Sequence, residues 1–131
     1  MPTEILPNLF LGDLTDAQAW TGLNISVLDI RSELLPGNVL NIPILAQDED
    51  RASHRALESV AYAIDRGLQG DAKVLVSCGQ GIERSPLAIV WFLYRYRGYS
   101  ISNAYALVVE KRPQVQRREH WIAGGEFPVW W

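Results

Sequence analysis

The chain has 131 residues, of which 48% are apolar and 21% charged, and its formal net charge is −3. This length supports one compact domain with its own core, so we expect a single domain spanning residues 1–131. The small negative charge excludes a bulk electrostatic attraction to nucleic acid or to an anionic membrane.

The candidate elements follow one another as strands and helices. Short segments rich in Val, Ile and Leu predict strands at 4–12, 25–30 and 39–45, and apolar residues at helical spacing then predict a helix over 51–68. A fourth strand is expected at 73–77, followed by a nearly all-apolar helix that begins at Pro86 and ends at Gly98. Ser100 is a candidate N-cap for a further helix that stops at Pro113. This order predicts an α/β fold with a central, mostly parallel sheet of four to five strands flanked by helices.

Segments that direct a chain to a membrane or bind a metal are not evident in the sequence. The chain shows no basic and apolar leader, and its longest apolar run, 86–94, is about half a membrane span. We therefore expect a cytoplasmic protein. The single cysteine excludes an internal disulfide, and His54 and His120 lie far apart in the sequence, so neither a metal nor another cofactor is expected.

The loop between the last strand and the apolar helix reads Cys-Gly-Gln-Gly-Ile-Glu-Arg-Ser-Pro, residues 78–86. The backbone N–H groups of such a loop and the N-terminus of the following helix converge on one point, where they bind a dianion. Gly79 and Gly81 permit torsions that turn the N–H groups inward, and Arg84 offers a planar fork of donors to two phosphate oxygens. The predicted phosphate-binding residues are Gly79, Gln80, Gly81, Ile82, Glu83 and Arg84.

Two side chains of this loop are candidates for covalent chemistry. The positive field of the loop favours the thiolate form of Cys78, which makes it a nucleophile facing a phosphoryl group. Ser85 can donate its hydroxyl to the sulfur and assist its departure when a covalent intermediate is hydrolysed. From these residues alone a simple glycine-rich turn with a small buried cysteine remains the other interpretation.

The same residues carry a resemblance to the cysteine-dependent protein tyrosine phosphatases, in particular the small dual-specificity phosphatases. The signature of that family is His-Cys, five residues with a glycine third, then Arg and Ser or Thr. Cys78, Gly81, Arg84 and Ser85 fall on it. Segments 4–17, 26–33 and 99–116 also resemble the family's opening strands and first helix, its next strand, and the helix after the central one.

The resemblance implies a phosphoprotein phosphatase that acts on phosphotyrosine, and on phosphoserine or phosphothreonine, through a phosphocysteine intermediate. It implies catalysis without a metal, a phosphorylated protein or peptide as substrate, and phosphate, vanadate or a similar oxyanion as inhibitor. A monomer is favoured.

Two positions depart from the family pattern. Ser77 stands where the family has the histidine that helps to position the loop. The family's general acid is an aspartate four residues after the isoleucine of an Ile-Pro strand, and that position is Ala46 here. We expect Asp48 to be the acid, with Asp50 as the alternative and Glu49 also a candidate, although acidic residues before a helix also serve as caps.

These departures leave a second function open, a phospho-binding module without useful catalysis, and a sulfur-transferase-like loop is a third. Glu83 argues against a polyanionic phosphoinositide substrate, and we expect its side chain to point away from the phosphate and pair with a neighbouring base. A basic stretch near the chain's end is interpreted as a solvated helix end, or alternatively as a rim that attracts acidic substrate; it comprises Lys111, Arg112, Arg117 and Arg118.

Overall fold

The computed structural model of the chain describes residues 1–28, 34–45 and 51–123. Each segment predicted from the sequence contains an element of the expected kind. In chain order the elements are β1 (Thr3–Leu6), β2 (Leu9–Gly12), α1 (Leu14–Gln18), β3 (Leu23–Leu28), β4 (Val39–Pro43), α2 (His54–Gln69), β5 (Val74–Ser77), α3 (Arg84–Tyr96), α4 (Ile101–Lys111) and α5 (Glu119–Ala123).

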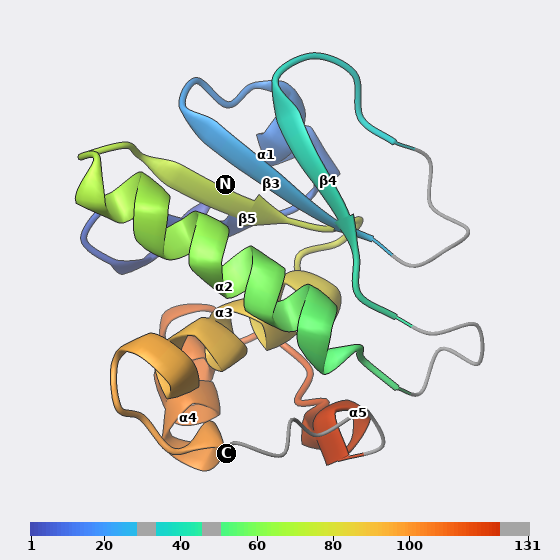
Figure 1. Cartoon of the computed structure of the whole chain (residues 1–131), viewed down its shortest axis with the longest axis vertical. Helices are drawn as coiled ribbons and strands as arrows, with labels where there is room; N and C mark the ends of the chain where they lie inside the picture. Colours follow the sequence, from blue (N-terminus) through green and yellow to red (C-terminus); the bar gives the residue numbers. More distant parts are fainter. Residues whose placement is uncertain (29–33, 46–50, 124–131) are drawn as a thin grey trace.

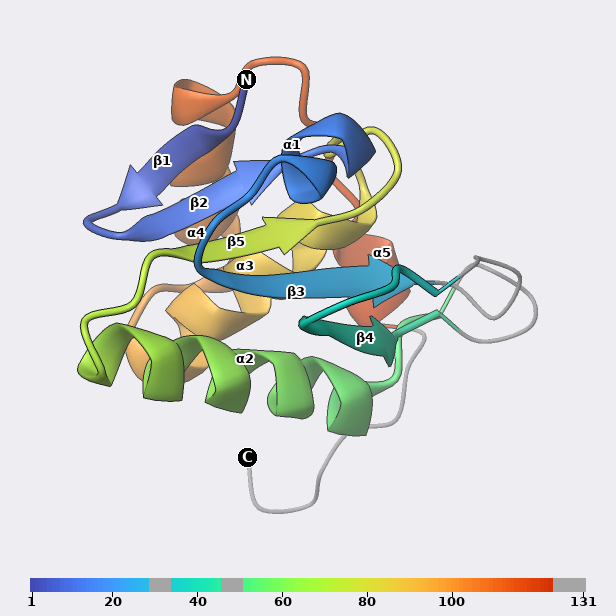
Figure 2. The ribbon, with the colours of Figure 1, turned by 90° about the horizontal axis from the view of Figure 1, so that it is seen from above.

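The described part of the chain forms a five-stranded sheet in the order β1-β2-β5-β3-β4. Figure 1 shows β5, β3 and β4 beside one another, and Figure 2 also labels β1 and β2. Among these five strands β1 and β2 pair antiparallel, while β2–β5, β5–β3 and β3–β4 are parallel. The α/β prediction with a mostly parallel sheet is therefore confirmed. Because β3, β4 and β5 run in the same direction, their carboxyl ends meet at one edge of the sheet, where ligand sites of such sheets form.

The N-terminal apolar segment is two strands instead of one. The chain turns at Asn8, whose φ is 69° and whose backbone N–H donates to a Glu4 carboxylate oxygen at 3.0 Å. Asparagine adopts this left-handed conformation more readily than most residues, so a turn fits between the two apolar runs.

The sheet lies between α1 on one face and α2, α3 and α4 on the other (Figure 2). The strands divide their side chains accordingly. Val27 and Val76 belong to the core on the helical face, whereas Asn24 turns to the other face and donates its side-chain N–H to the Ala17 carbonyl of α1 at 3.0 Å.

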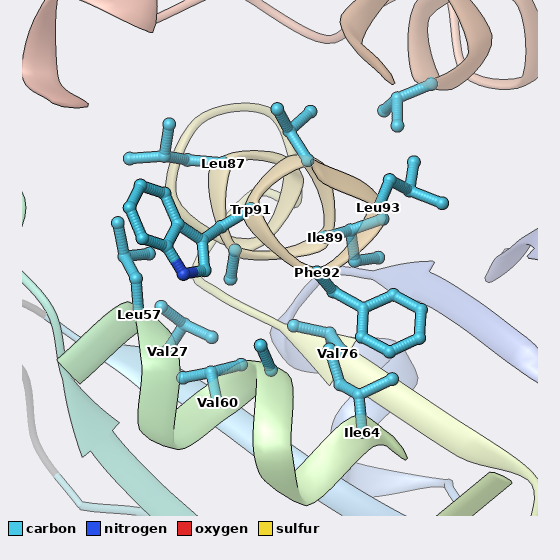
Figure 3. Close-up of a cluster of buried hydrophobic side chains, with 14 of the residues drawn as sticks. Val27, Leu57, Val60, Ile64, Val76, Leu87, Ile89, Trp91, Phe92 and Leu93 are labelled. Atoms are coloured by element: carbon cyan, nitrogen blue, oxygen red, sulfur yellow. The ribbon is translucent and has the colours of Figure 1, made fainter. Parts of the chain in front are cut away.

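The core sits around α3, in which every residue from Ser85 to Leu93 is buried. Trp91 and Phe92 of this helix belong to one buried cluster with Val60 and Ile64 of α2 and with Val27 and Val76 of the sheet (Figure 3). A helix that is apolar on all faces is stable only when other elements surround it. The burial of this helix confirms the prediction of a buried central helix. It anchors the loop that precedes it.

Helix boundaries differ from the sequence expectation by a few residues. Ser100 caps α4 as predicted, since its side chain accepts the Asn103 N–H at 3.1 Å. The central helix begins at Arg84 instead of Pro86. Proline is tolerated there because the first-turn N–H groups have no partner inside a helix. Helix α5 was not anticipated.

In the part of the chain that the structure describes, none of the helices has the length and apolarity needed to cross a membrane. The expectation that residues 1–131 form a single domain stays a prediction.

Candidate active site

The loop between β5 and α3, residues 78–83, is called the cysteine loop below. Its first residue, Cys78, is only 6% exposed. The Cys78 Sγ and the Ser85 Oγ are 3.1 Å apart, and the Ser85 backbone N–H donates to Sγ at 3.3 Å. Two polar groups of one residue thus contact the sulfur.

The far half of the cysteine loop is held by the chain that follows α4. The Arg112 Nε donates to the Gly81 carbonyl at 3.0 Å, and the Gln116 backbone N–H donates to the Ile82 carbonyl at 2.8 Å. Both carbonyl oxygens therefore point outward, toward this supporting segment.

The near half is held from β2 and α1. The Cys78 N–H donates to the Gly12 carbonyl at 3.4 Å, and the Leu14 N–H donates to the Gly79 carbonyl at 3.1 Å. The short helix α1 is itself fixed by a reciprocal cap, because the Asp16 N–H donates to Asp13 and the Asp13 N–H donates to Asp16. The hydrogen bond from the Asp16 backbone lowers the pKa of Asp13 below its ordinary value.

These supports determine where the amides point. In a trans peptide the carbonyl of one residue and the N–H of the next face opposite ways. Outward carbonyls at positions 79, 81 and 82 consequently turn the N–H groups of Gln80, Ile82 and Glu83 toward the inside of the loop. Among the described residues these three N–H groups have no hydrogen-bond acceptor, so they form the kind of concave nest that binds anions.

The two glycines of the loop differ in how strictly the structure requires glycine at each position. Gly81 has a φ of +69°, and a Cβ placed on it would lie 2.7 Å from the Gly12 carbonyl oxygen and 2.9 Å from Arg112 Nη2. Only glycine fits there. Gly79 has no positive φ, and its added Cβ would meet Arg84 Nη2 at 3.4 Å. This distance is an ordinary van der Waals contact, so neither a backbone torsion nor a lack of space requires glycine at position 79.

The Arg84 guanidinium lies between Gly79 and the end of β3, where its Nη1 donates to the Val27 carbonyl at 3.3 Å. A pocket of about 250 Å³, called the cradle below, opens over the loop. The cradle is lined by Cys78, Gly79, Gln80, Ile82, Glu83 and Arg84. The structure thus brings the predicted phosphate-binding residues together, with Gly81 shaping the loop from outside the lining. Their function in binding stays a prediction.

Ser77 directs its hydroxyl away from the cysteine loop. It is 1% exposed, and its Oγ donates to the Asn24 Oδ1 of β3 at 3.4 Å. Asn24 is in turn held by α1. The Ser77 hydroxyl therefore contributes its hydrogen bond to the sheet beneath the loop.

Glu83 pairs with a base, as the sequence analysis expected. The Arg118 Nε donates to its Oε2 at 3.0 Å. The Arg118 backbone N–H also donates to the Tyr105 hydroxyl at 3.1 Å, and burial raises the pKa of Tyr105, so this hydroxyl stays neutral. The carboxylate of Glu83 is thus drawn to the outer side of the loop.

The interpretation of residues 111–118 as a solvated basic stretch is wrong for Arg112. Its side chain is 5% exposed, and besides Gly81 it contacts the Met1 carbonyl at 3.1 Å and the Thr3 Oγ1 at 2.9 Å through Nη1. The sequence held one signal for this, because Arg112, the C-cap residue of α4, lies four residues after the buried Val108. Neither a rim nor a solvated end describes it.

The candidate acids Asp48, Glu49 and Asp50 lie outside the described residues, so their assignment stays a prediction. The flanks of their segment are placed. Leu45 and Ala52 are buried and form an isolated antiparallel bridge, and the Ile44 N–H donates to the Leu28 carbonyl at the end of β3 at 2.8 Å. This is the edge of the sheet at which β5 leads into Cys78.

Metal-binding clusters of His, Cys, Asp or Glu do not occur within residues 1–28, 34–45 and 51–123. The buried His54 contacts the Ile122 carbonyl through Nε2 at 2.7 Å, which ties α2 to α5.

The chain is similar to known phosphatases over most of its length. The family model "dual specificity phosphatase, catalytic domain" matches residues 23–124. The chain is 31% identical over 134 residues to the dual specificity protein phosphatase Mpk3 of Drosophila melanogaster, covering 92% of this chain but 32% of that protein. It is 27% identical over 117 residues to the putative tyrosine phosphatase 123R of Invertebrate iridescent virus 6, covering 85% of this chain and 80% of that protein. The chain thus spans about a third of the first relative and most of the second.

A solved structure of a mouse putative dual specificity phosphatase, complexed with zinc tungstate, has the same fold. It superposes with a TM-score of 0.71 at 23% identity, covering 92% of this chain and 80% of that one.

Proposed function

Because the chain belongs to the dual specificity phosphatase family, we propose that it hydrolyses phosphotyrosine, together with phosphoserine and phosphothreonine, through a phosphocysteine intermediate. Membership of the family makes it a cysteine-based protein phosphatase that acts on phosphoproteins. The observation that carries the finer proposal is the Cys78 sulfur, contacted by two groups of Ser85 at the base of an amide-lined cradle.

In the first step the Cys78 thiolate attacks phosphorus and the bond to the leaving oxygen breaks. The loop amides and the Arg84 guanidinium stabilise the charge on the three equatorial oxygens, which is the main electrostatic contribution available here. Asp48, or Asp50 in its place, gives its proton to the leaving oxygen, so a neutral phenol or alcohol departs.

In the second step water attacks the phosphorus of phosphocysteine and the S–P bond breaks. The carboxylate formed in the first step accepts a proton from the water, and the electron pair returns to sulfur. The Ser85 hydroxyl, 3.1 Å from Sγ, stabilises the departing thiolate. Inorganic phosphate is released and the enzyme is restored.

The charges around the cradle support a phosphopeptide over a polyanionic lipid headgroup. Arg84 is the one basic side chain that lines the cradle among the described residues, and the Glu83 carboxylate is held on the outer side of the loop by Arg118. The tungstate complex of the mouse relative supports tests of tungstate, phosphate and vanadate as competitive inhibitors of this chain.

The decisive experiment compares wild type with Cys78→Ser on an aryl phosphate and on phosphotyrosine and phosphoserine peptides, without added metal. Wild type should release phosphate, and Cys78→Ser should bind the peptides without turnover. Acid quenching during turnover should trap a phosphorylated Cys78. Full activity of Cys78→Ser would refute the proposal. Asp48→Asn and Asp50→Asn then identify the acid, since the correct change flattens the basic limb of the pH–rate profile.

A second candidate function, a phospho-binding module with little catalysis, is favoured by the orientation of Ser77 toward Asn24. It predicts that wild type binds a phosphopeptide without releasing phosphate. Turnover that disappears in Cys78→Ser would exclude it.

A further inference from the structure

A second pocket, called the side pocket below, opens beside the cradle. Its volume is about 440 Å³, and it shares Cys78, Gly79 and Arg84 with the cradle. The remaining lining comes from α1, β3, the end of β5 and the segment before β4. It consists of Leu14, Gln18, Ser26, Leu28, Leu34, Leu35, Pro36 and Ser77.

The side pocket has a floor of small side chains and walls of large apolar ones. Ser26 of β3 and Ser77 of β5 are paired in the sheet, and both are buried. Their side chains are small and leave the space above the sheet open. On the walls Leu14 is 41% and Leu34 69% exposed. Arg84, at the shared border, is the only charged side chain that lines the side pocket among the described residues.

The outer wall is fixed before any ligand arrives. The Asn41 side chain of β4 accepts the Leu35 N–H at 2.9 Å and donates to the Leu35 carbonyl at 3.0 Å. Both backbone polar groups of Leu35 are therefore satisfied by one side chain. Preorganisation of this kind lowers the entropy lost on binding.

The side pocket continues along the same face of the sheet. A further pocket of about 450 Å³ shares Gln18, Leu35 and Pro36 with it and extends to Trp20 and Val39. The two pockets therefore lie next to each other and share part of their wall.

The direction in which Cys78 attacks phosphorus determines which part of a substrate lies near the side pocket. The leaving oxygen lies opposite the attacking Cys78 sulfur, so the phosphorylated side chain rises out of the cradle. The side pocket meets the cradle only along Cys78, Gly79 and Arg84, which places it beside that path. We propose that the side pocket binds an apolar side chain of a residue that flanks the phosphorylated residue in a peptide substrate. This inference rests on the proposed phosphatase function.

The first test compares two phosphotyrosine peptides that differ only in having leucine or glutamate at the positions flanking phosphotyrosine. Wild type should have a kcat/KM that is roughly tenfold or more higher for the leucine peptide, the range that one apolar contact supplies. Equal values for the two peptides would overturn the proposal. An aryl phosphate, which has no flanking residue, separates this failure from failure of the phosphatase function. If no substrate is turned over, the same preference must appear in peptide affinities, measured with Cys78→Ser.

The second test changes the pocket wall. Leu34→Glu should remove the preference for leucine, raise kcat/KM for a peptide with flanking lysine, and leave aryl phosphate hydrolysis unchanged. The matched control is Leu40→Glu, because Leu40 is 44% exposed on β4 but lines neither pocket. Equal effects of the two changes would contradict the proposal. A loss of aryl phosphate hydrolysis in Leu34→Glu would also contradict it, by assigning the side pocket to the phosphorylated ring itself.

Discussion

Two arginines contact the cysteine loop from opposite sides, and they differ in what their guanidinium groups face. Arg84 is partly exposed, lines the cradle, and donates to the Val27 carbonyl at 3.3 Å. Arg112 is buried and spans three protein acceptors, one in the loop and two near the N-terminus.

This difference suits Arg84 to binding the phosphate and Arg112 to positioning the loop backbone. A guanidinium at the open face of the cradle can form a bidentate contact with a phosphate, whereas one already engaged by carbonyl and hydroxyl groups fixes the backbone that surrounds the phosphate. Arg112 is thus a positioning residue, since it holds the Gly81 carbonyl outward and links the loop to β1.

The largest effect is expected at Arg84. Arg84→Lys retains the charge but loses the planar fork, so kcat/KM for an aryl phosphate should fall on the order of 10²–10³-fold. Lysine can keep part of the contact with the Val27 carbonyl, so the free energy of unfolding should fall by about 1.5 kcal/mol, the low end of the range for a hydrogen bond that involves a charged group. Steady-state kinetics and urea denaturation measure the two quantities. A kcat/KM within threefold of wild type would remove Arg84 from phosphate recognition.

At Arg112 the substitution should cost more stability and less activity than at Arg84. Arg112→Lys cannot satisfy the Gly81, Met1 and Thr3 acceptors together, so the free energy of unfolding should fall by about 2–3 kcal/mol. Loss of the hydrogen bond that holds the Gly81 carbonyl outward should displace the loop N–H groups and lower kcat about tenfold.

The matched control for Arg112 is Arg117→Lys, because the Arg117 side chain is 41% exposed and pairs with Glu119. Its stability should stay within about 0.5 kcal/mol of wild type. If Arg112→Lys lost stability but kept the wild-type kcat under folding conditions, Arg112 would support the fold without positioning the loop.

The contrast between the two arginines also explains how far sequence reasoning reached. Cys78, Arg84 and Ser85 lie within one eight-residue stretch of the chain, so the strand, turn and helix signals around them were enough to predict that they meet at one loop. Arg112 reaches that loop from the C-cap of another helix, α4. Its four-residue spacing from Val108 predicts burial, but no local pattern indicates that a buried arginine would find the Gly81 carbonyl.

Other differences have similar causes. The partner of Ser77 is Asn24, a contact that depends on the register between β5 and β3. The position of the β1–β2 turn depends on Asn8 adopting a left-handed conformation within an apolar segment. Such non-local or single-residue effects are invisible to periodicity, whereas the apolar runs that made the sheet and α3 were strong enough to predict the fold.

The smallest effect is expected at the ion pair between Glu83 and Arg118, which touches the loop on the same outer side as Arg112. The two side chains are 37% and 27% exposed, so solvent screens them and their coupling should be about 0.2–1 kcal/mol. A double-mutant cycle with Glu83→Gln and Arg118→Gln, followed by urea denaturation, measures this coupling, which should shrink as salt is raised. A coupling above about 2 kcal/mol that persists in high salt would mean that the loop depends on this pair as well, and the assignment of its outer support to Arg112 would then fail.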